Sequence, residues 1–217
     1  MKLMPFDTET TGVEPPIGVV EVAWLELDSD MGVVLDSEKC YLIDPEIPIE
    51  CGAAGVHGIR QEDITEDLPT LSEIDWPSGE IIFVAHNAPF DRPLLEPYLN
   101  IVEELCTLRL ARRLLPDAPD HKLSTLSCYC DLSRQLPHRA LGDVLTTAWL
   151  LDYLIEGSGL NIQELIAYSK EPMIFTRMPW GKHKGLMMEE VPRGYLQWCI
   201  QQDIDEDMRA TANHWLK

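Results

Sequence analysis

The sequence predicts an α/β fold in which helices flank a mixed five-stranded sheet, followed by a small C-terminal appendage. Short runs rich in β-forming residues alternate with segments whose apolar residues recur at helical spacing. Glycine and proline then interrupt this pattern in the last quarter of the chain. Strands are expected at residues 3–9, 17–28, 33–44, 81–86 and near 103–107.

Turn-forming and helix-capping residues between these runs indicate where the turns and helices lie. Ser29-Asp30-Met31-Gly32 is typical of a hairpin turn between the second and third strands. After the apolar run 81–85, Asn87 has the chemistry of a helix N-cap, and Pro89 fits a first helical turn because proline needs no N–H partner there. Helices are therefore expected at residues 88–98, 107–115, 122–131, 140–155 and 161–169.

The chain is expected to divide after its longest helix. Gly157 and Gly159 end that helix, since glycine favours the position after a helix, and Pro172 breaks the pattern again. We therefore predict one domain over residues 1–168 and a small lobe over residues 173–217. In the lobe, a glycine-punctuated turn at 180–185 carries basic residues beside aromatic ones, which suits either stacking on a strand end or a small core of its own.

Two acidic residues follow the first predicted strand. Residues i and i+2 of a strand face the same side, so Asp7 and Glu9 are expected to project together from its end. Adjacent carboxylates repel each other unless a cation lies between them, and oxygen ligands suit Mg²⁺ or Mn²⁺. The alternative is a strand-to-turn segment with two solvated carboxylates.

Two later segments supply further polar groups at comparable places. Asp91 falls in the first turn of a helix that starts where the fourth strand ends, and alternatively only complements the helix N-terminus. Asp143 lies near the start of the apolar helix 140–155, where an isolated buried carboxylate would be unfavourable. His138 precedes that helix and can reach the same cleft from a loop, or is a surface histidine beside a buried aspartate.

The order and spacing of these motifs resemble the DEDDh branch of the DnaQ-like 3′–5′ exonucleases. The resemblance rests on Asp7-x-Glu9, then Asp91 in His-Asn-x-x-Phe-Asp, then His138-x-x-x-x-Asp143, and spans about residues 3–155. It implies a ribonuclease-H-like arrangement of the sheet and helices. Pro5 departs from the pattern because proline cannot donate within a sheet, so a bulge or an unpaired position is expected there.

The resemblance also implies a mechanism. Asp7 would bridge two divalent ions, Mg²⁺ or Mn²⁺. Glu9 and Asp143 would complete the carboxylate ligands of the first ion, and Asp91 would support the second. His138 would take the proton from the attacking water, a task that suits a side chain that titrates near neutral pH.

Substrate contacts are implied at five further positions. A loop of related exonucleases packs against the terminal nucleotide, so His57 and Ile59 are expected to contact its sugar and base, although His57 would equally suit a role in stabilising its own loop. The backbone at Thr8 is expected near the terminal 3′-hydroxyl. Asn87, in the His-Asn-x-x-Phe-Asp motif, and Arg112, in the basic segment 105–140, are the remaining expected substrate contacts.

The charge balance limits this interpretation. A formal net charge of −20 is unusual for a protein that approaches a polyanion. Residues 105–140, however, are enriched in basic side chains: Arg109, Arg112, Arg113, Lys122, Arg134 and Arg139. This segment is expected either to border the cleft or to form a solvated helix face. Such a protein suits capture of a few terminal nucleotides better than tracking along a duplex.

Composition sets the remaining expectations. No apolar run is long enough to span a membrane, and no secretion leader is recognisable, so a cytoplasmic protein is expected. The six cysteines are scattered and are expected to be reduced thiols. The oligomeric state is left open, with a homodimer as one alternative.

The sequence thus predicts a metal-dependent 3′–5′ exonuclease that binds nucleic-acid 3′ ends, single-stranded or frayed duplex, and releases 5′-mononucleotides from DNA. One alternative is an exoribonuclease acting on short RNA, because the choice between DNA and RNA depends on how the pocket treats one 2′-hydroxyl. Further alternatives are a slow or non-catalytic end-binding module and a proofreading subunit docked on a polymerase.

Overall fold

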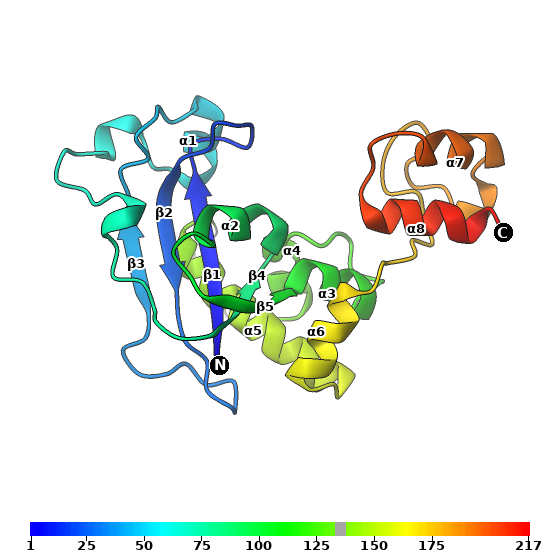
Figure 1. Cartoon of the computed structure of the whole chain (residues 1–217). Helices are drawn as coiled ribbons and strands as arrows, with labels where there is room; N and C mark the ends of the chain where they lie inside the picture. Colours follow the sequence, from blue (N-terminus) through cyan, green and yellow to red (C-terminus); the bar gives the residue numbers. More distant parts are fainter. Residues whose placement is uncertain (133–137) are drawn as a thin grey trace. The chain divides into compact units, whose positions relative to one another are not determined.

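The computed structural model describes residues 1–132 and 138–217 as two compact units, Met1–Ile166 and Ala167–Lys217. Arg134, one of the basic residues singled out above, lies outside the described residues. Figure 1 shows the chain coloured from its N-terminus to its C-terminus. The division falls inside a helix, close to the boundary expected at residues 168–173.

The predicted α/β architecture with a mixed five-stranded sheet is confirmed for the first unit. The strands are β1 (Lys2–Thr10), β2 (Val19–Trp24), β3 (Lys39–Leu42), β4 (Ile81–Ala85) and β5 (Ile101–Cys106). Their order is β3-β2-β1-β4-β5, which puts β1 in the centre. The β1–β2 and β2–β3 pairs are antiparallel, whereas β1–β4 and β4–β5 are parallel. The carboxyl ends of β1 and β4 therefore lie at the same edge of the sheet.

Of the two alternatives expected at Pro5, a bulge or an unpaired position, the structure shows no bulge there but one missing hydrogen bond. Pro5 pairs with Val84 in the parallel ladder, and its carbonyl accepts a bond of 3.3 Å from the N–H of Leu25. The reciprocal bond is missing because proline has no N–H, and β2 ends next to it at Trp24. The irregularity of the β1–β2 pair lies instead between Glu9 and Thr10.

The second and third strands are shorter than predicted. The turn between them forms where expected, because the Asp28 carboxylate accepts from the N–H groups of Asp30 and Gly32, and Met31 takes a left-handed conformation. Leu27 and Val33 pair only as an isolated bridge across this turn. Regular pairing of β2 with β3 starts farther along, between residues 21–24 and 39–42.

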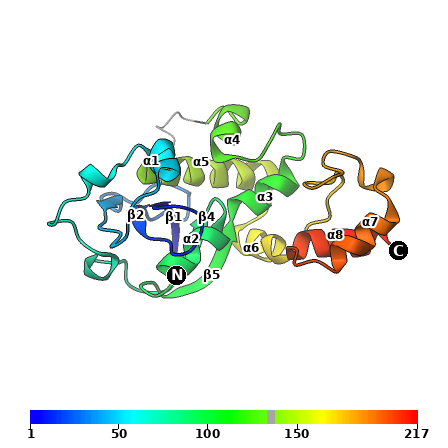
Figure 2. The ribbon, with the colours of Figure 1, turned by 90° about the horizontal axis from the view of Figure 1, so that it is seen from above.

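Helices cover the sheet. The helices of the first unit are α1 (Cys51–His57), α2 (Ala88–Leu95), α3 (Thr107–Leu114), α4 (Leu123–Tyr129), α5 (Ala140–Ser158) and α6 (Ile162–Lys170), which crosses into the second unit. The long α5 packs across β1 and β2, as Figure 2 shows from above. It ends as predicted at Gly159, which adopts a left-handed conformation that closes the last turn.

The apolar core keeps the central strand in place. Phe6 of β1 stacks on Phe83 of β4 with ring centroids 5.0 Å apart, and Trp24 of β2 continues the aromatic cluster. Ala88 and Leu95 of α2 are buried in this same cluster. Phe6 and Asp7 are neighbours in a strand, so packing Phe6 toward α2 turns Asp7 toward the other face.

Five helices form near their predicted ranges, but α1 was not predicted. Its sequence contains Gly52 and Gly55, which lower helix propensity, and it has no side-chain N-cap bond. Two short 3₁₀ helices follow at Gln61–Asp63 and Leu71–Glu73. In the described part of the chain, no helix is both long and apolar enough to cross a membrane.

The second unit has its own small core. Its helices are α7 (Arg193–Ile200) and α8 (Glu206–Trp215), with a 3₁₀ turn at Met188–Glu190. Buried apolar side chains come from this turn, from the residues flanking it and from both helices: Met178, Met188, Val191, Leu196, Cys199, Met208 and Ala212. Trp180 and Tyr195 pack against this cluster, as expected if the lobe has a small core of its own. Trp198 is 48% exposed.

Candidate active site

Three of the predicted carboxylates meet in one cluster. Asp7 and Glu9 come from β1, and Asp143 comes from the first turn of α5. One carboxylate oxygen of each residue lies within 4.8 Å of the others. The alternation of side chains along β1 places Asp7 and Glu9 on one face, and the packing of α5 across β1 brings Asp143 to them.

Asp91 reaches the same strand through Thr8. Its Oδ1 accepts two bonds from Thr8, from the backbone N–H at 3.1 Å and from Oγ1 at 2.7 Å. Both residues are buried. Thr8 lies between Asp7 and Glu9 in the strand, so its side chain points to the opposite face. Thr8 therefore holds Asp91 of α2, and its N–H is not free for a terminal 3′-hydroxyl while that bond lasts.

Burial and mutual repulsion raise the pKa values of the acids in and beside this cluster. Burial, followed by the charges of Asp143, Glu21 and Asp91, raises the pKa of Glu9 to about 8. Burial and the charge of Asp91 raise the pKa of Asp7 well above its ordinary range. Burial also raises the pKa of Asp91 to about 7, although its bonds from Thr8 act in the opposite direction.

This donor set fits a hard divalent cation. The ligand atoms are all carboxylate oxygens, which Mg²⁺ and Mn²⁺ prefer. The raised pKa values show that ionising all these groups together is unfavourable for the protein alone. A bound cation reverses that preference because it stabilises the ionised forms.

His138 lies next to the cluster. It has a left-handed conformation with φ of 59°, and its backbone N–H donates to Asp143 Oδ2 at 3.1 Å. Burial raises the pKa of Asp143, whereas this bond and the nearby His138 charge lower it. His138 is exposed, so water and substrate can reach its ring. Left-handed backbone is rare for a non-glycine residue, which indicates that the surroundings impose it.

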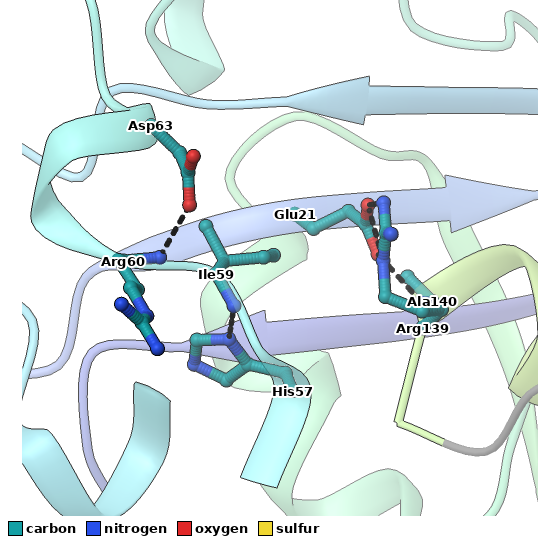
Figure 3. Close-up of polar contacts among 7 residues, drawn as sticks. All are labelled: Glu21, His57, Ile59, Arg60, Asp63, Arg139 and Ala140. Atoms are coloured by element: carbon teal, nitrogen blue, oxygen red, sulfur yellow. Dashed lines mark hydrogen bonds and ion pairs between the residues drawn. The ribbon is translucent and has the colours of Figure 1, made fainter. Parts of the chain in front are cut away.

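Sequence analysis missed one acidic residue of the site, Glu21. It lies opposite Glu9 in the β1–β2 register and is 1% exposed. Its carboxylate accepts from the guanidinium of Arg139 and from the N–H of Ala140 at 2.8 Å, as Figure 3 shows. The signal was present in the sequence as one glutamate inside the apolar run Val19–Trp24.

His57 and Ile59 lie together at the end of α1. His57 is buried, its Nδ1 accepts from the N–H of Ile59 at 3.1 Å (Figure 3), and its Nε2 lies 3.2 Å from the Thr10 carbonyl. Burial lowers the pKa of the His57 ring. Because both ring nitrogens are engaged, the structure supports the role of His57 in holding this loop against β1. Ile59 is also buried.

Asn87 and Arg112 are both exposed. Asn87 occupies the predicted N-cap position of α2 but has a left-handed backbone and makes no side-chain capping bond. Arg112 lies near the end of β4, since its charge contributes to lowering the pKa of His86 to about 4, after burial as the main cause. His86 is held by Thr107 and by the carbonyl of His121. Both proposed contacts thus lie at the ends of β4 and α3.

Comparison with known sequences gives one family for most of the chain. The RNase_T family model, described as Exonuclease, matches residues 5–151, and a second model, described as "Putative quorum-sensing-regulated virulence factor", matches residues 170–206. Exodeoxyribonuclease 10 of Escherichia coli K12 is 32% identical over 97% of both chains. The PolC-type DNA polymerase III of Bacillus subtilis is 31% identical over 67% of this chain but only 11% of its own length.

Solved structures agree with the sequence comparison. A structure described as exonuclease X in complex with 5′ overhanging duplex DNA is 31% identical, with a TM-score of 0.65, and is matched over 77% of this chain and 99% of its own. An exonuclease I structure matches over the same share of this chain and 42% of its own, with a TM-score of 0.58 and 18% identity. The latter likeness concerns the fold alone.

Proposed function

This chain belongs to the RNase_T family of 3′–5′ exonucleases, and from that premise we propose that it hydrolyses DNA from 3′ ends and releases 5′-mononucleotides. The observation that carries the proposal is the cluster in which carboxylate oxygens of Asp7, Glu9 and Asp143 lie within 4.8 Å of one another. The DNA substrate is supported by the names of the two relatives that match at 31–32% identity, an exodeoxyribonuclease and an exonuclease X bound to duplex DNA.

The carboxylates would hold the divalent cations on which this chemistry depends. Asp7, Glu9 and Asp143 would hold one ion, and Asp91, whose charge acts on Asp7, would help Asp7 to hold a second, with Mg²⁺ as the expected ion and Mn²⁺ as a substitute. When bound, such ions offset the charge of the phosphate and of the leaving 3′-oxygen. The protein contributes the fixed positions of its oxygens, through the alternation of β1, the first turn of α5 and the bond from Thr8 to Asp91.

We assign proton transfer to His138. Its backbone is tied to Asp143, so its ring stays beside the carboxylate cluster while remaining open to solvent. The ring would accept a proton from the water whose oxygen attacks the terminal phosphorus. The bond from phosphorus to the 3′-oxygen of the preceding nucleotide then breaks, that oxygen takes a proton, and a 5′-mononucleotide leaves.

We propose a separate task for the C-terminal lobe. Lys182 and Lys184 are exposed on its turn, and the ring of His183 between them meets Tyr195 edge-on at 4.6 Å. Trp198 lies 5.3 Å from Tyr195 and is about half exposed. Exposed aromatic rings beside cationic side chains are typical of surfaces that stack single-stranded bases. This surface would retain strands that extend beyond the terminal nucleotides.

A substrate panel tests the proposed activity. Single-stranded DNA, blunt and recessed duplex DNA and short RNA are compared, each with Mg²⁺, Mn²⁺ or EDTA. We expect mononucleotide release from DNA 3′ ends with either ion and none in EDTA. Asp7→Asn should be inactive with its fold intact, whereas Asp75→Asn, an exposed control, should retain activity. Turnover by Asp7→Asn near the wild-type rate would contradict the assignment, and faster hydrolysis of short RNA would favour the exoribonuclease alternative.

A further inference from the structure

Glu21 is a buried carboxylate that the proposed mechanism does not use. It lies in the middle of β2, a strand whose residues are all buried, and is 1% exposed. A carboxylate in such a place is strongly unfavourable unless it is hydrogen-bonded and paired. Its partners therefore indicate why the chain keeps an acidic residue there.

The Glu21 carboxylate is fully engaged by the start of α5. The Nε of Arg139 lies 3.1 Å from both of its oxygens, Nη2 of the same guanidinium bonds Oε1, and the N–H of Ala140 donates to Oε2 at 2.8 Å. Figure 3 shows these side chains reaching across from β2 to the beginning of the helix. An arginine fork on a carboxylate fixes orientation as well as distance.

These bonds replace the cap that α5 lacks. Arg139 is the N-cap residue of α5, and its side chain makes no capping bond to the helix. Ala140 is the first helical residue, so its N–H is one of the groups that a helix leaves without an internal partner. Glu21 accepts from this N–H and places a negative charge at the positive end of the helix. The helix is thus capped from the neighbouring strand.

The capped segment carries two of the active-site residues. His138 directly precedes Arg139, and Asp143 follows in the first turn, where its N–H donates to the Arg139 carbonyl at 3.0 Å. The Asp143 carboxylate in turn accepts from the N–H of His138. Displacing Arg139 would therefore move the proposed base and one metal-binding carboxylate together.

The strand register links this anchor to the other half of the site. Glu21 pairs directly with Glu9 across β1 and β2, so the two side chains point to the same face. Glu9 belongs to the carboxylate cluster, whereas Glu21 is bound by Arg139. The guanidinium also offsets a charge that otherwise acts on Glu9 together with the charges of Asp143 and Asp91.

We propose that Glu21 and Arg139 are positioning residues that anchor the start of α5 to β2, so that His138 and Asp143 stay in register with Asp7 and Glu9. This inference rests on the proposed nuclease activity and adds two residues to it. Glu21 and Arg139 act through the catalytic groups and do not touch the reacting atoms.

Substitutions that weaken the anchor to different degrees test the inference. Arg139→Gln removes the fork, Arg139→Lys keeps the charge without the fork, and Glu21→Gln keeps an acceptor for Ala140 without the charge. The double variant Glu21→Gln/Arg139→Gln avoids leaving one buried charge unpaired and keeps the test valid if Arg139→Gln alone fails to fold. Lys2→Gln is the control, because it breaks the Lys2–Glu26 ion pair of 2.9 Å elsewhere on β1.

The readouts are kcat, KM, the Mg²⁺ concentration for half-maximal rate, and the melting temperature in EDTA. We expect Arg139→Gln and the double variant to lower kcat by about 10–100-fold, with KM within about threefold, because misplacement of catalytic groups affects the rate of the bound complex. Half-saturating Mg²⁺ should rise in both variants. Arg139→Lys should recover part of kcat, and Lys2→Gln should match the wild type.

Two outcomes would overturn the inference. If kcat and Mg²⁺ dependence stay at wild-type values while only the melting temperature falls, the pair merely supports the fold. If KM rises while kcat is unchanged, Arg139 binds the substrate directly through its exposed side. Inactive wild-type and Lys2→Gln proteins would instead contradict the proposed nuclease activity, so the two failures are distinguishable.

Discussion

Replacing Glu9 by glutamine should stabilise the metal-free protein, and the size of this stabilisation should increase with pH. Burial is the main cause that raises the pKa of Glu9 from 4.5 to about 8, followed by the charges of Asp143, Glu21 and Asp91. Between these two values the unfolded chain releases the proton while the folded chain retains it. The folded state therefore binds more protons, and the free energy of unfolding falls as pH rises through this window.

The size of the effect follows from the shift. Each pKa unit corresponds to about 1.4 kcal/mol, so the full shift would amount to about 5 kcal/mol. Part of the Glu9 carboxyl remains solvated and the neighbouring acids share the interaction, so we expect about 1–2 kcal/mol at pH 8. For a chain of this size, that difference corresponds to a rise in melting temperature of roughly 2–8 °C.

Thermal unfolding at pH 4.5 and pH 8, with EDTA or with saturating Mg²⁺, measures this directly. In EDTA, Glu9→Gln should melt above the wild type at pH 8, and the difference should be much smaller at pH 4.5, where Glu9 is protonated in the folded state and about half protonated in the unfolded chain. Mg²⁺ should stabilise the wild type more than the variant, because binding to the folded state adds to stability. Glu66→Gln, on an exposed loop, is the matched control.

The reasoning is refuted if Glu9→Gln melts at or below the wild-type temperature at pH 8 in EDTA. It is equally refuted if Mg²⁺ raises the melting temperatures of wild type and variant by the same amount. Either result would mean that Glu9 is not held among repelling carboxylates that a cation relieves.

Three further predictions separate chemistry from binding. His138→Ala should lower kcat by about 10²–10⁴-fold with a smaller change in KM and an altered pH–rate profile; an unchanged profile would remove His138 from the mechanism. Arg112→Gln should raise KM and flatten the salt dependence of the rate, since fewer phosphates are neutralised, and an unchanged salt dependence would place Arg112 away from the strand. Deleting residues 173–217 should preserve dinucleotide hydrolysis but slow the hydrolysis of longer strands, whereas loss of both activities with unfolding would show that the chain has one core.

The parts of the site that were predictable follow from local rules. Side-chain alternation in a strand needs only the position of the strand, so Asp7 and Glu9 were expected on one face before any partner was known. The start of α5 was equally visible from the apolar spacing after Asp143. The strand β1 is central in the sheet and the helix α5 is long, and the secondary structure that each local sequence favours is the one that the fold contains.

The parts that were missed depend on contacts distant in sequence. The ladder places Glu21 beside Glu9, and the packing of α5 across β2 gives it a partner 118 residues away. Local sequence carries no information about that register, although a single glutamate in an apolar strand indicates that a partner exists. Thr8 is similar: the structure engages its N–H and hydroxyl with Asp91, 83 residues later.

The acidic character of the chain can be reconciled with a polyanionic substrate through the order of binding. Four acids and Glu21 surround the reaction centre, and Arg139 offsets only one of these charges. A phosphate that enters before any cation would be repelled by the ionised carboxylates of this cluster. On the proposed function, divalent cations held by these carboxylates would bind before the substrate and would make the acidic cluster attractive to a terminal phosphate. The net charge of −20 then disfavours long stretches of bound duplex, while the terminal nucleotides would meet carboxylates whose charge the cations offset.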